Sequence, residues 1–533
     1  MRSHIRWALS ALLAAALVLL TACGGGGSQS AGNAAGSDEL RVALALGDLS
    51  SLDPARSYSD ANGPLLGLFG DTLTAIPADD FKGVNPSLAT KWSASEDLKT
   101  YTFTLRPDVK FASGNQMTSA DVAFSIDRLK NIQGASSYLA ANIATIETPD
   151  PQTVVFTLAS PDSTFATLVS TPYMSILDSA VLKAKGGLSD PSAATADKTQ
   201  EFLDANTVGT GPYVLKSWTR NQEVIFEANP NYWGDKPAYK TITVKDVREA
   251  STQAQLLQGH DVDVALNIDP DTANSLKNRG VEISRSKSLN LVYLAMNNKA
   301  PGVPQLGDPR VRKAIEMAID YDGISAAFAN GTPRPGAFVP LGLDGADAVT
   351  PVAHDPDGAR KLLADAGVSG LNFDVTFANV VWYGVPQSAL WQKIKADLDA
   401  VGITVNIKPA EYESWVEGFR NGSSTLTTGL WAPDYPSSSG YFDVLAQPDG
   451  LFSKRLSTSI PDGEQLYQDY LSEKDAATRS KTAAKIAQEF ADQASVQPIV
   501  QPDTVVAHSS AVTGIGYSPQ YILGLRTAKP ANA

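Results

Sequence analysis

The side chains that most often perform covalent chemistry are sparse or scattered in this sequence. Only four of the 533 residues are histidine, and His260, His354 and His508 lie far apart along the chain. Acidic pairs such as Asp79 and Asp80 could act as glycosidase carboxylates, although exposed charge is the commoner role of such pairs. No nucleophile elbow, zinc-protease motif, phosphate loop or dinucleotide fingerprint occurs. We therefore expect a protein with no catalytic residues, no metal site and no cofactor.

Composition and charge narrow the classes of partner. With 43% hydrophobic and 19% charged residues, the chain has an ordinary globular composition and is long enough for several domains. The formal net charge of −14 disfavours nucleic acid as a partner, because binding to phosphate backbones depends on clustered Lys and Arg. We expect a folded protein that does not bind nucleic acid.

The first residues have the pattern of a secretion signal. Arg2 and Arg6 precede an apolar stretch at 7–20, which is shorter than the roughly 20 residues that span a bilayer as a helix. The stretch ends in Leu20-Thr-Ala-Cys23, which resembles the lipobox of bacterial lipoproteins, whose cysteine is acylated. Cys23 is the only cysteine, so an intrachain disulfide is impossible. An ordinary signal peptide and an uncleaved anchor are the alternatives, and each of them also places the body outside the cytoplasmic membrane.

The next segment lacks the apolar residues of a core. Residues 24–37 include four consecutive glycines and are otherwise small or polar, which is typical of a flexible linker. We expect a lipoprotein signal peptide at 1–22 and a flexible tether at 23–37. The body is then extracytoplasmic and attached to the cell membrane through a lipid on Cys23.

Strand and helix signals alternate along the body. Segments 101–105, 153–158, 223–227 and 241–244 combine β-branched and aromatic residues between turn formers, which predicts strands. Thr118 followed by Asp121 predicts the capped start of a helix. Further along, Asp308 and Asp355 each precede a proline and predict two more helix starts.

A β-α-β-α-β run follows in the second half of the body. Strands are expected at 373–377, 403–407 and 426–431, with a helix bearing Leu390, Ile394 and Leu398 on one face and another at 412–420. Right-handed crossovers would place these strands in one sheet, with ligand-facing loops after Phe377 and Trp431. A helix at 476–494 and an extended segment at 496–508 complete the pattern.

Seven short motifs carry a resemblance to a known family. In chain order they are Leu52-Asp-Pro54, Pro86-Ser-Leu-Ala89, Tyr101-Thr-Phe-Thr-Leu-Arg106, Thr118-Ser-Ala-Asp-Val122, Gly209-Thr-Gly-Pro-Tyr213, Asn229-Pro-Asn-Tyr-Trp-Gly234 and Asp308-Pro-Arg-Val-Arg-Lys-Ala314. Together they resemble motifs of the family 5 extracytoplasmic solute-binding proteins of bacterial ABC importers, a group that includes oligopeptide-, dipeptide- and nickel-binding proteins.

The resemblance implies an α/β fold of the two-lobed, type II periplasmic-binding-protein kind, with an extra α/β subdomain and a hinge between the lobes. Lobe one would comprise 38–288 plus 507–533, with the extra subdomain at about 85–205, and lobe two would comprise 289–506. Such a protein acts as a monomer. It buries a short peptide by hinge closure and delivers it to ABC permease subunits that work with cytoplasmic ATPases.

The resemblance also implies ligand-binding residues. Peptide-binding members hold the ligand as an added strand, and the aspartate of a Trp-x-x-Asp motif pairs with the ligand's α-ammonium. Asp434 occupies that position, and its alternative role is that of a turn residue between Pro433 and Pro436. The two edges that hold the ligand would be Tyr58, Ser59 and Asp60 on one side and Leu430, Trp431 and Ala432 on the other, and looser matches to cleft-lining segments are Tyr138, Trp382, Tyr383 and Gly384.

Several departures from the family pattern leave the ligand open. Thr428 stands where an oligopeptide binder can have arginine, and serines replace the Asp-Pro that often follows the aspartate motif. An oligosaccharide or a metal chelate is therefore an alternative ligand, and a tethered extracellular hydrolase is an alternative of another class. Aromatic residues that could stack on a sugar are Trp382, Trp391, Trp415, Trp431, Tyr435 and Tyr441, although the spacing of Trp391 from Leu390 and Ile394 favours core packing.

Overall fold

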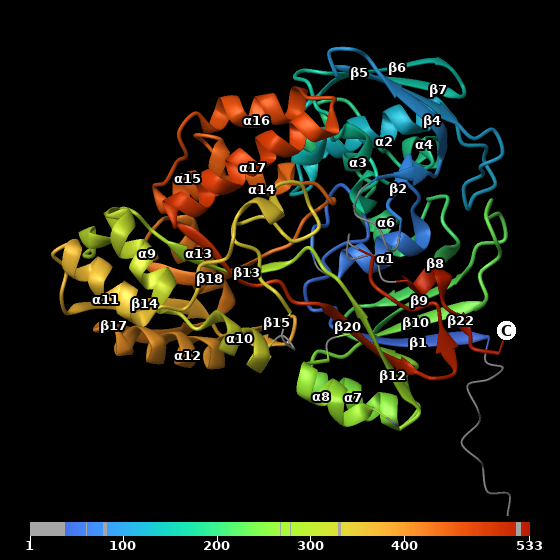
Figure 1. Ribbon diagram of the computed structural model, residues 1–533. Helices are drawn as coiled ribbons and strands as arrows, with labels where there is room; N and C mark the ends of the chain where they lie inside the picture. The colour runs from blue at the N-terminus through green and yellow to red at the C-terminus, as the bar shows by residue number, and fades with distance from the viewer. Residues whose placement is uncertain are drawn as a thin grey trace, which may run out of the picture. The chain divides into compact units, whose positions relative to one another are not determined.

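The computed structural model describes residues 38–59, 61–77, 83–266, 268–277, 279–328, 332–518 and 524–532. The expected signal and tether, Cys23 and Asp60 lie outside these ranges. Within them, the strands form a seven-stranded, a four-stranded and a three-stranded sheet and four two-stranded pairs (Figure 1). No helix in these ranges is both long and apolar enough to cross a membrane.

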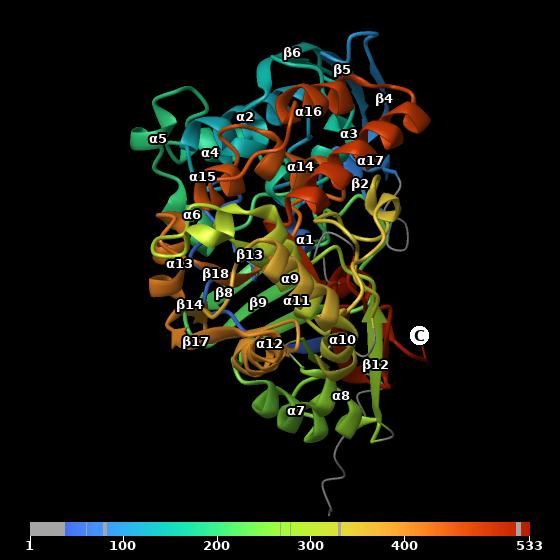
Figure 2. The ribbon, with the colours of Figure 1, turned by 60° about the vertical axis from the view of Figure 1, so that its left-hand side comes forward.

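The seven-stranded sheet joins segments from distant parts of the chain. Its order is β12 (Val281–Ser286), β20 (Thr504–Ser509), β11 (Val264–Ala265), β1 (Glu39–Leu44), β10 (Thr241–Asp246), β9 (Glu223–Ala228) and β8 (Tyr213–Thr219). Alternate residues of β1 face opposite sides, so Val42 joins the large core while Ala43 packs with Leu257 and Leu276. These two leucines belong to α7 (Ala250–Gln258) and α8 (Pro270–Leu276), which lie below the sheet in Figures 1 and 2.

The four-stranded sheet is antiparallel, in the order β4 (Ala89–Ala94), β5 (Thr100–Leu105), β7 (Thr153–Leu158) and β6 (Ile143–Asp150). Every second residue of β5 and β7 is buried, which puts Phe103 and Phe156 in edge-to-face contact. Next to this sheet, α2 (Ser119–Ile132) begins with the predicted capping box of Thr118 and Asp121. The four strands predicted in this half of the chain are confirmed as β5, β7, β9 and β10.

A buried ionic cluster ties this sheet's helix to the N-terminal segment. Arg128 of α2 donates to both carboxylate oxygens of Asp53, at 2.8 and 2.6 Å, and to Asp197 at 3.0 Å. Arg56 pairs with the same two carboxylates, at 2.5 and 2.9 Å. Burial alone would raise the pKa of Asp53 and of Asp197, but the hydrogen bonds and charge of Arg128 hold both below the ordinary value. The cluster thereby fixes the start of the chain segment that leads to Tyr58.

The second half of the body is built on two smaller groups of strands. β13 (Leu291–Met296) lies between β18 (Leu426–Trp431) and β19 (Val496–Val500) and is antiparallel to both. β14 (Leu371–Ala378) and β17 (Ile403–Ala410) form a separate parallel pair, which α12 (Gln387–Ala400) covers with Leu390 and Ile394.

The β-α-β-α-β segments were correctly located, but their predicted union in one sheet is wrong. After α13 (Tyr412–Arg420) the chain forms β18, which pairs with β13 and not with β17. β13 comes from much earlier in the sequence. The third strand, β18, therefore belongs to the three-stranded sheet, in which β13 and β19 connect to strands of the seven-stranded sheet. Its end at Trp431 lies beside the start of β13 at Leu291.

The predicted helix starts are also present. Asp308 and Asp355 cap α9 (Pro309–Ala318) and α11 (Pro356–Asp365) by accepting backbone N–H groups at 2.8 Å. The predicted extended segment at 496–508 is interrupted, because residues 501–503 separate β19 from β20. Further helices are α1 (Asn62–Phe69), α10 (Tyr321–Phe328), α14 (Ser439–Ala446), α15 (Leu451–Leu456), α16 (Gly463–Ser472) and α17 (Ala476–Gln493).

The remaining elements are short. They are β2 (Thr74–Ala75), β3 (Asn85–Pro86), α3 (Phe165–Leu168), α4 (Ser179–Ala184), α5 (Ala193–Ala196), α6 (Gln200–Ala205), β15 (Val381–Trp382), β16 (Val385–Pro386), β21 (Val512–Thr513), β22 (Lys529–Pro530) and the 3-10 turns η1 (Ser137–Ala140), η2 (Pro172–Met174), η3 (Pro304–Gly307), η4 (Ala346–Ala348) and η5 (Gly524–Thr527).

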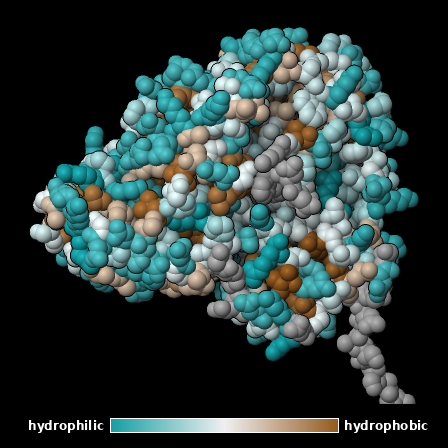
Figure 3. All heavy atoms as spheres, in the orientation of Figure 1, coloured by the Kyte–Doolittle hydropathy of each residue, from teal (hydrophilic) through white to brown (hydrophobic). Residues whose placement is uncertain are grey.

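The chain passes twice between the seven-stranded and the three-stranded sheet, from β12 to β13 and from β19 to β20. The two crossings are bonded to each other, since Gln501 Nε2 donates to the Ser288 carbonyl at 2.7 Å and Ser288 Oγ donates to the Pro502 carbonyl. On the face that Figure 3 shows, hydrophilic residues predominate and hydrophobic ones form small, separate patches.

The ionic cluster should be necessary for stability. Replacing Arg128→Met leaves two buried carboxylates short of a cation, and we expect the free energy of unfolding to fall by about 3–5 kcal/mol at pH 7 in urea denaturation. Since both carboxylates have lowered pKa values, this difference should shrink as the pH falls below about 4. The control is Arg310→Met, which removes an exposed pair with Asp308 and should cost less than about 1 kcal/mol. Equal losses in the two variants would contradict the assignment.

Candidate functional site

The carboxylate of Asp434 receives hydrogen bonds from two tyrosines that are distant in sequence. Tyr58 Oη donates to Asp434 Oδ2 at 2.9 Å, and Tyr138 Oη donates to the same oxygen. The rings of the two tyrosines meet edge to face, with centroids 6.4 Å apart. Asp434 follows β18, whereas Tyr58 and Tyr138 lie in the part of the chain held by the ionic cluster. Three of the predicted site residues are therefore in direct contact.

The electrostatics of this group are those of a carboxylate without a cation. Burial raises the pKa of Asp434, and the two tyrosine hydrogen bonds lower it only in part. Desolvation of the hydroxyls, on side chains that are 42% and 49% exposed, and the charge of Asp434 raise the pKa of Tyr58 and of Tyr138, so both remain neutral donors. In the described residues, Asp434 takes part in no ion pair. A positively charged group would therefore be the best partner for it.

Neighbouring contacts hold the two tyrosines in place. Ser59 Oγ donates to Asn62 Oδ1 at 2.7 Å, at the start of α1, and the ring of Tyr58 packs against that of Tyr173 at 5.1 Å. Tyr138 lies in η1, and just before it the Ser136 hydroxyl donates to the Pro54 carbonyl at 2.9 Å. Ser59 thus acts through its neighbours, while Asp60 lies outside the described residues.

The β18 segment presents a strand edge at the site. Leu430 and Trp431 pair with Val292 and Leu291 of β13, and in the described residues no strand pairs with the opposite edge of β18. Trp431 Nε1 donates to the Gly440 carbonyl at 3.1 Å, which fixes the loop that carries Asp434. Leu430, Trp431 and Ala432 are all half-buried. An edge of this kind can add an extended guest through main-chain hydrogen bonds.

The predicted Trp382, Tyr383 and Gly384 segment is a tight hairpin between β15 and β16. Tyr383 and Gly384 have φ values of 48° and 80°, the pattern of a two-residue type I′ turn. Trp382 packs on Trp415, with ring centroids 5.7 Å apart. Among the described residues, neither Trp382 nor Gly384 forms a hydrogen bond or ring contact with the tyrosine–carboxylate group.

The aromatic residues considered for sugar stacking divide into two sets. Trp391, Trp415 and Tyr441 are core residues, and their polar atoms bond to Thr428, Thr427 and the Leu289 carbonyl. Trp382, Trp431 and Tyr435 are half-buried. The buried set cannot offer a ring face to a ligand. Thr428 is likewise internal, where it bonds to Trp391 and Gln387.

The site also contains residues that the sequence reasoning missed. Tyr173, which supports Tyr58, gave no sequence signal. Asp443 gave one, because it is the only charged residue in the otherwise apolar helix α14. Its carboxyl group is close enough for the charge of Asp434 to raise its pKa.

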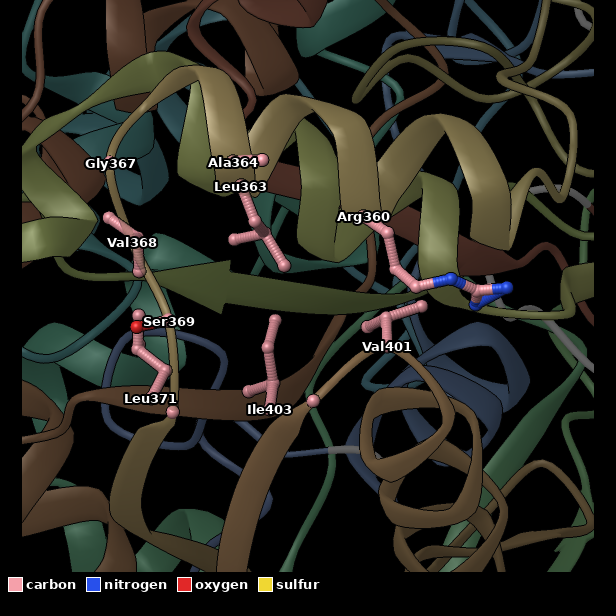
Figure 4. Close-up of a pocket in the computed structure, with 11 residues that line it drawn as sticks. Arg360, Leu363, Ala364, Gly367, Val368, Ser369, Leu371, Val401 and Ile403 are labelled. Atoms are coloured by element: carbon pink, nitrogen blue, oxygen red, sulfur yellow. The ribbon is translucent and has the colours of Figure 1, made fainter.

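A separate pocket contains none of the predicted residues. It lies between α11, the end of α12 and the first residues of β14 and β17, and Figure 4 shows Leu363, Leu371 and Ile403 around it. Ligands of α/β folds bind at the carboxyl ends of parallel strands, whereas this pocket adjoins their amino ends. We therefore do not assign the site to it. In the described ranges no cluster of three or more His, Cys, Asp or Glu side chains is arranged to hold a metal ion.

Most of the chain resembles known proteins in sequence. Residues 83–452 match the model of the bacterial extracellular solute-binding proteins, family 5. The chain is 28% identical over 485 residues to the probable D,D-dipeptide-binding periplasmic protein DdpA of Escherichia coli, covering 89% of this chain and 90% of that protein.

Solved structures share the fold. The dipeptide-binding protein of Pseudoalteromonas sp. SM9913 in complex with Met-Leu is similar with a TM-score of 0.78, at 22% identity, covering 92% of this chain and 100% of that one. NikA of Brucella suis in complex with Fe(III)-EDTA is similar with a TM-score of 0.79, at 23% identity, covering 92% and 99%. The predicted α/β fold of the type II periplasmic binding proteins is thus confirmed.

The tyrosine hydrogen bonds should set the ionisation of Asp434. In a Tyr58→Phe, Tyr138→Phe double variant we expect the pKa of Asp434 to rise further, because only burial then acts on it. Carbon-13 NMR titration of labelled aspartates, with Asp434→Asn to assign the signal, measures the change. Tyr412→Phe, on an exposed ring of α13, should leave the pKa of Asp434 unchanged. A lower pKa in the double variant would show that the hydroxyls do not donate to the carboxylate.

Proposed function

Because the chain belongs to the bacterial extracellular solute-binding proteins of family 5, we propose that it captures short peptides and delivers them to an ABC permease. In this role the protein binds and releases its ligand without chemical change and needs no cofactor. The ligand-binding residues would be those around Asp434.

The observation that carries the proposal is the carboxylate of Asp434 with only neutral donors around it. A carboxylate has about four lone-pair sites, so two tyrosine hydroxyls leave room for further donors. The α-ammonium of a peptide offers both the positive charge and the N–H groups that this position lacks. Neutral sugars would supply hydrogen bonds but no charge.

The edge of β18 with which no strand of the described residues pairs supports the same ligand class. Main-chain groups at Leu430, Trp431 and Ala432 can bond to an extended backbone whatever its side chains are. Asp434 follows this edge by two residues, so an ammonium group at Asp434 and a peptide backbone along the edge are compatible. Sequence-tolerant peptide binding follows from this arrangement.

The proposal includes a division into two lobes. Lobe one would be 38–288 plus 507–533, with its extra subdomain at about 85–205, and lobe two would be 289–506. The crossings at Ser288 and Gln501 would then form the hinge. Tyr58 and Tyr138 would belong to lobe one and Asp434 to lobe two, so closure would enclose a ligand between them.

The location of the protein is part of the proposal. A lipid on Cys23 and the tether at 23–37 would hold a monomeric body at the outer side of the cell membrane, close to the permease subunits and their cytoplasmic ATPases. The glycine-rich composition of the tether and the match to a family of extracellular solute-binding proteins support this arrangement.

Binding without turnover tests the proposal. A thermal-shift screen of the body from Ser37 onward should give a raised midpoint with free di- to hexapeptides and none with their N-acetylated forms. A peptide present at 100 times its dissociation constant adds about 2.7 kcal/mol to the free energy of unfolding. Asp434→Asn should weaken peptide binding at least about 100-fold, because the buried ammonium loses its counter-charge.

Three outcomes would contradict this function. Shifts with oligosaccharides or metal chelates alone would make the protein a receptor for another solute. Cleavage of the peptides, detected by mass spectrometry, would show that the protein is a hydrolase. Equal binding by Asp434→Asn and by Asp374→Asn, a control on the exposed edge of β14, would remove Asp434 from the site.

A further inference from the structure

Helix α14 begins five residues after Asp434 and carries one charged side chain. Its deeply buried residues include Tyr441, Phe442 and Leu445. Gly440 and Asp443 are one turn apart, so they share a face of the helix, and both are half-buried. A side-chain carbon at Gly440 would have no atom within 4 Å. This face of α14 therefore borders open space.

Asp443 is poorly satisfied within the protein. Its Oδ1 is inaccessible to solvent and accepts no hydrogen bond, and the carboxyl group is in no ion pair of the described residues. Asp162, another carboxyl in this region, differs because its Oδ1 accepts from the Thr164 N–H at 2.9 Å and the Thr164 hydroxyl at 2.7 Å. Leaving a carboxyl group without partners costs free energy that the fold alone does not recover.

Asp443 shares its surroundings with the proposed site. Burial, followed by the charge of Asp434, raises its pKa to about 7, and only the Val444 backbone N–H acts in the other direction. After burial, the negative charges of Asp162, Asp443 and Asp434 also raise the pKa of Tyr435. The charge of Asp434 thus acts on Asp443, whereas the proposed ligand ammonium would pair only with Asp434.

The cations on the helices that pack against α14 are engaged elsewhere, except Lys481 and Lys485 of α17, which are exposed. Three helices, α15, α16 and α17, pack against α14. Helix α16 contributes Tyr467 and Tyr470, and burial raises the pKa of both, so they are neutral near pH 7. Arg479 of α17 lies 3.6 Å from Asp344, and on α15 Lys454 lies 4.0 Å from Asp449. Arg455, also on α15, lies over the Phe419 ring at 4.9 Å.

We propose that Asp443 is a second cation-binding group of the site, selective for peptides with a lysine, ornithine or arginine side chain at the first or second residue. This inference rests on the proposed function. The α-ammonium would pair with Asp434 and the side-chain cation with Asp443, so that two half-buried negative charges meet two positive ones. The side chain of the ligand would enter through the open space beside Gly440, on the face of α14 that also carries Asp443.

Isothermal titration calorimetry with matched tripeptides tests the inference. The probes are Lys-Ala-Ala, Ala-Lys-Ala and their norleucine counterparts, which keep the aliphatic length without the charge. We expect at least one lysine peptide to bind the native protein about tenfold or more tightly than its norleucine partner. Asp443→Asn should abolish this preference while keeping norleucine binding, and Asp449→Asn, an exposed acid just beyond α14, should retain the preference.

The outcomes separate the two proposals. If no peptide binds to the native protein, the proposed function fails. If peptides bind but lysine gives no advantage, or if Asp443→Asn keeps the advantage with an unchanged melting temperature, Asp443 is a structural residue bridged by water and the inference fails. Asp434→Asn should weaken all four peptides, since it acts on the group that they share.

A pH series adds a readout that a structural role would not change. Since the pKa of Asp443 is about 7, it is mostly protonated at pH 6 and mostly charged at pH 8. The ratio of lysine to norleucine affinity should therefore rise about tenfold over this interval. The α-ammonium and Asp434 are common to both peptides and cancel in the ratio. A ratio that is independent of pH in the native protein would overturn the inference.

Discussion

The arrangement of the site depends on the buried salt bridge between Arg128 and Asp53. The guanidinium of Arg128 lies between the carboxylates of Asp53 and Asp197. It joins α2 to the segment that leads from Asp53 to Tyr58. Tyr138 follows α2 by a few residues, so one arginine positions both hydroxyl groups that reach Asp434. A surface ion pair could not do this, because water screens it and its side chains remain mobile. Because the cluster is removed from water, breaking one of its ion pairs would leave a buried charge without a partner. The side chains of the cluster are therefore held in one arrangement.

A negative charge with neutral neighbours is the common theme of the site. Asp434 and Asp443 both have raised pKa values, and burial is the first cause for each. The phenol groups around them can donate hydrogen bonds but cannot neutralise charge. Such a site is electrostatically incomplete on its own, and a cationic ligand would stabilise it more than a neutral one of equal size.

Local elements could be predicted from the sequence, whereas their long-range pairing could not. The capped start of α2 at Thr118 and the bounds of α13 and β18 depend on residues close in sequence, so the pattern alone locates them. The pairing of β18 with β13 joins residues 130 to 140 positions apart, and no periodicity encodes it. Asp434, Tyr58 and Tyr138 came from family motifs, and their contact came only from the fold. Asp443 was missed because its one sequence signal, a single acid in a mostly apolar helix, matches no motif.

The unpaired edge of β18 has a consequence for association between molecules. Exposed strand edges are templates on which other chains add, and soluble proteins keep them short or interrupt them. Here the Thr427 hydroxyl already donates to the Thr376 carbonyl near the start of the edge, and Pro433 follows Ala432 without an N–H to offer. Only a few residues of open edge remain between these points. The molecule can thus keep a strand edge open for a small guest and still resist forming sheets with its own copies.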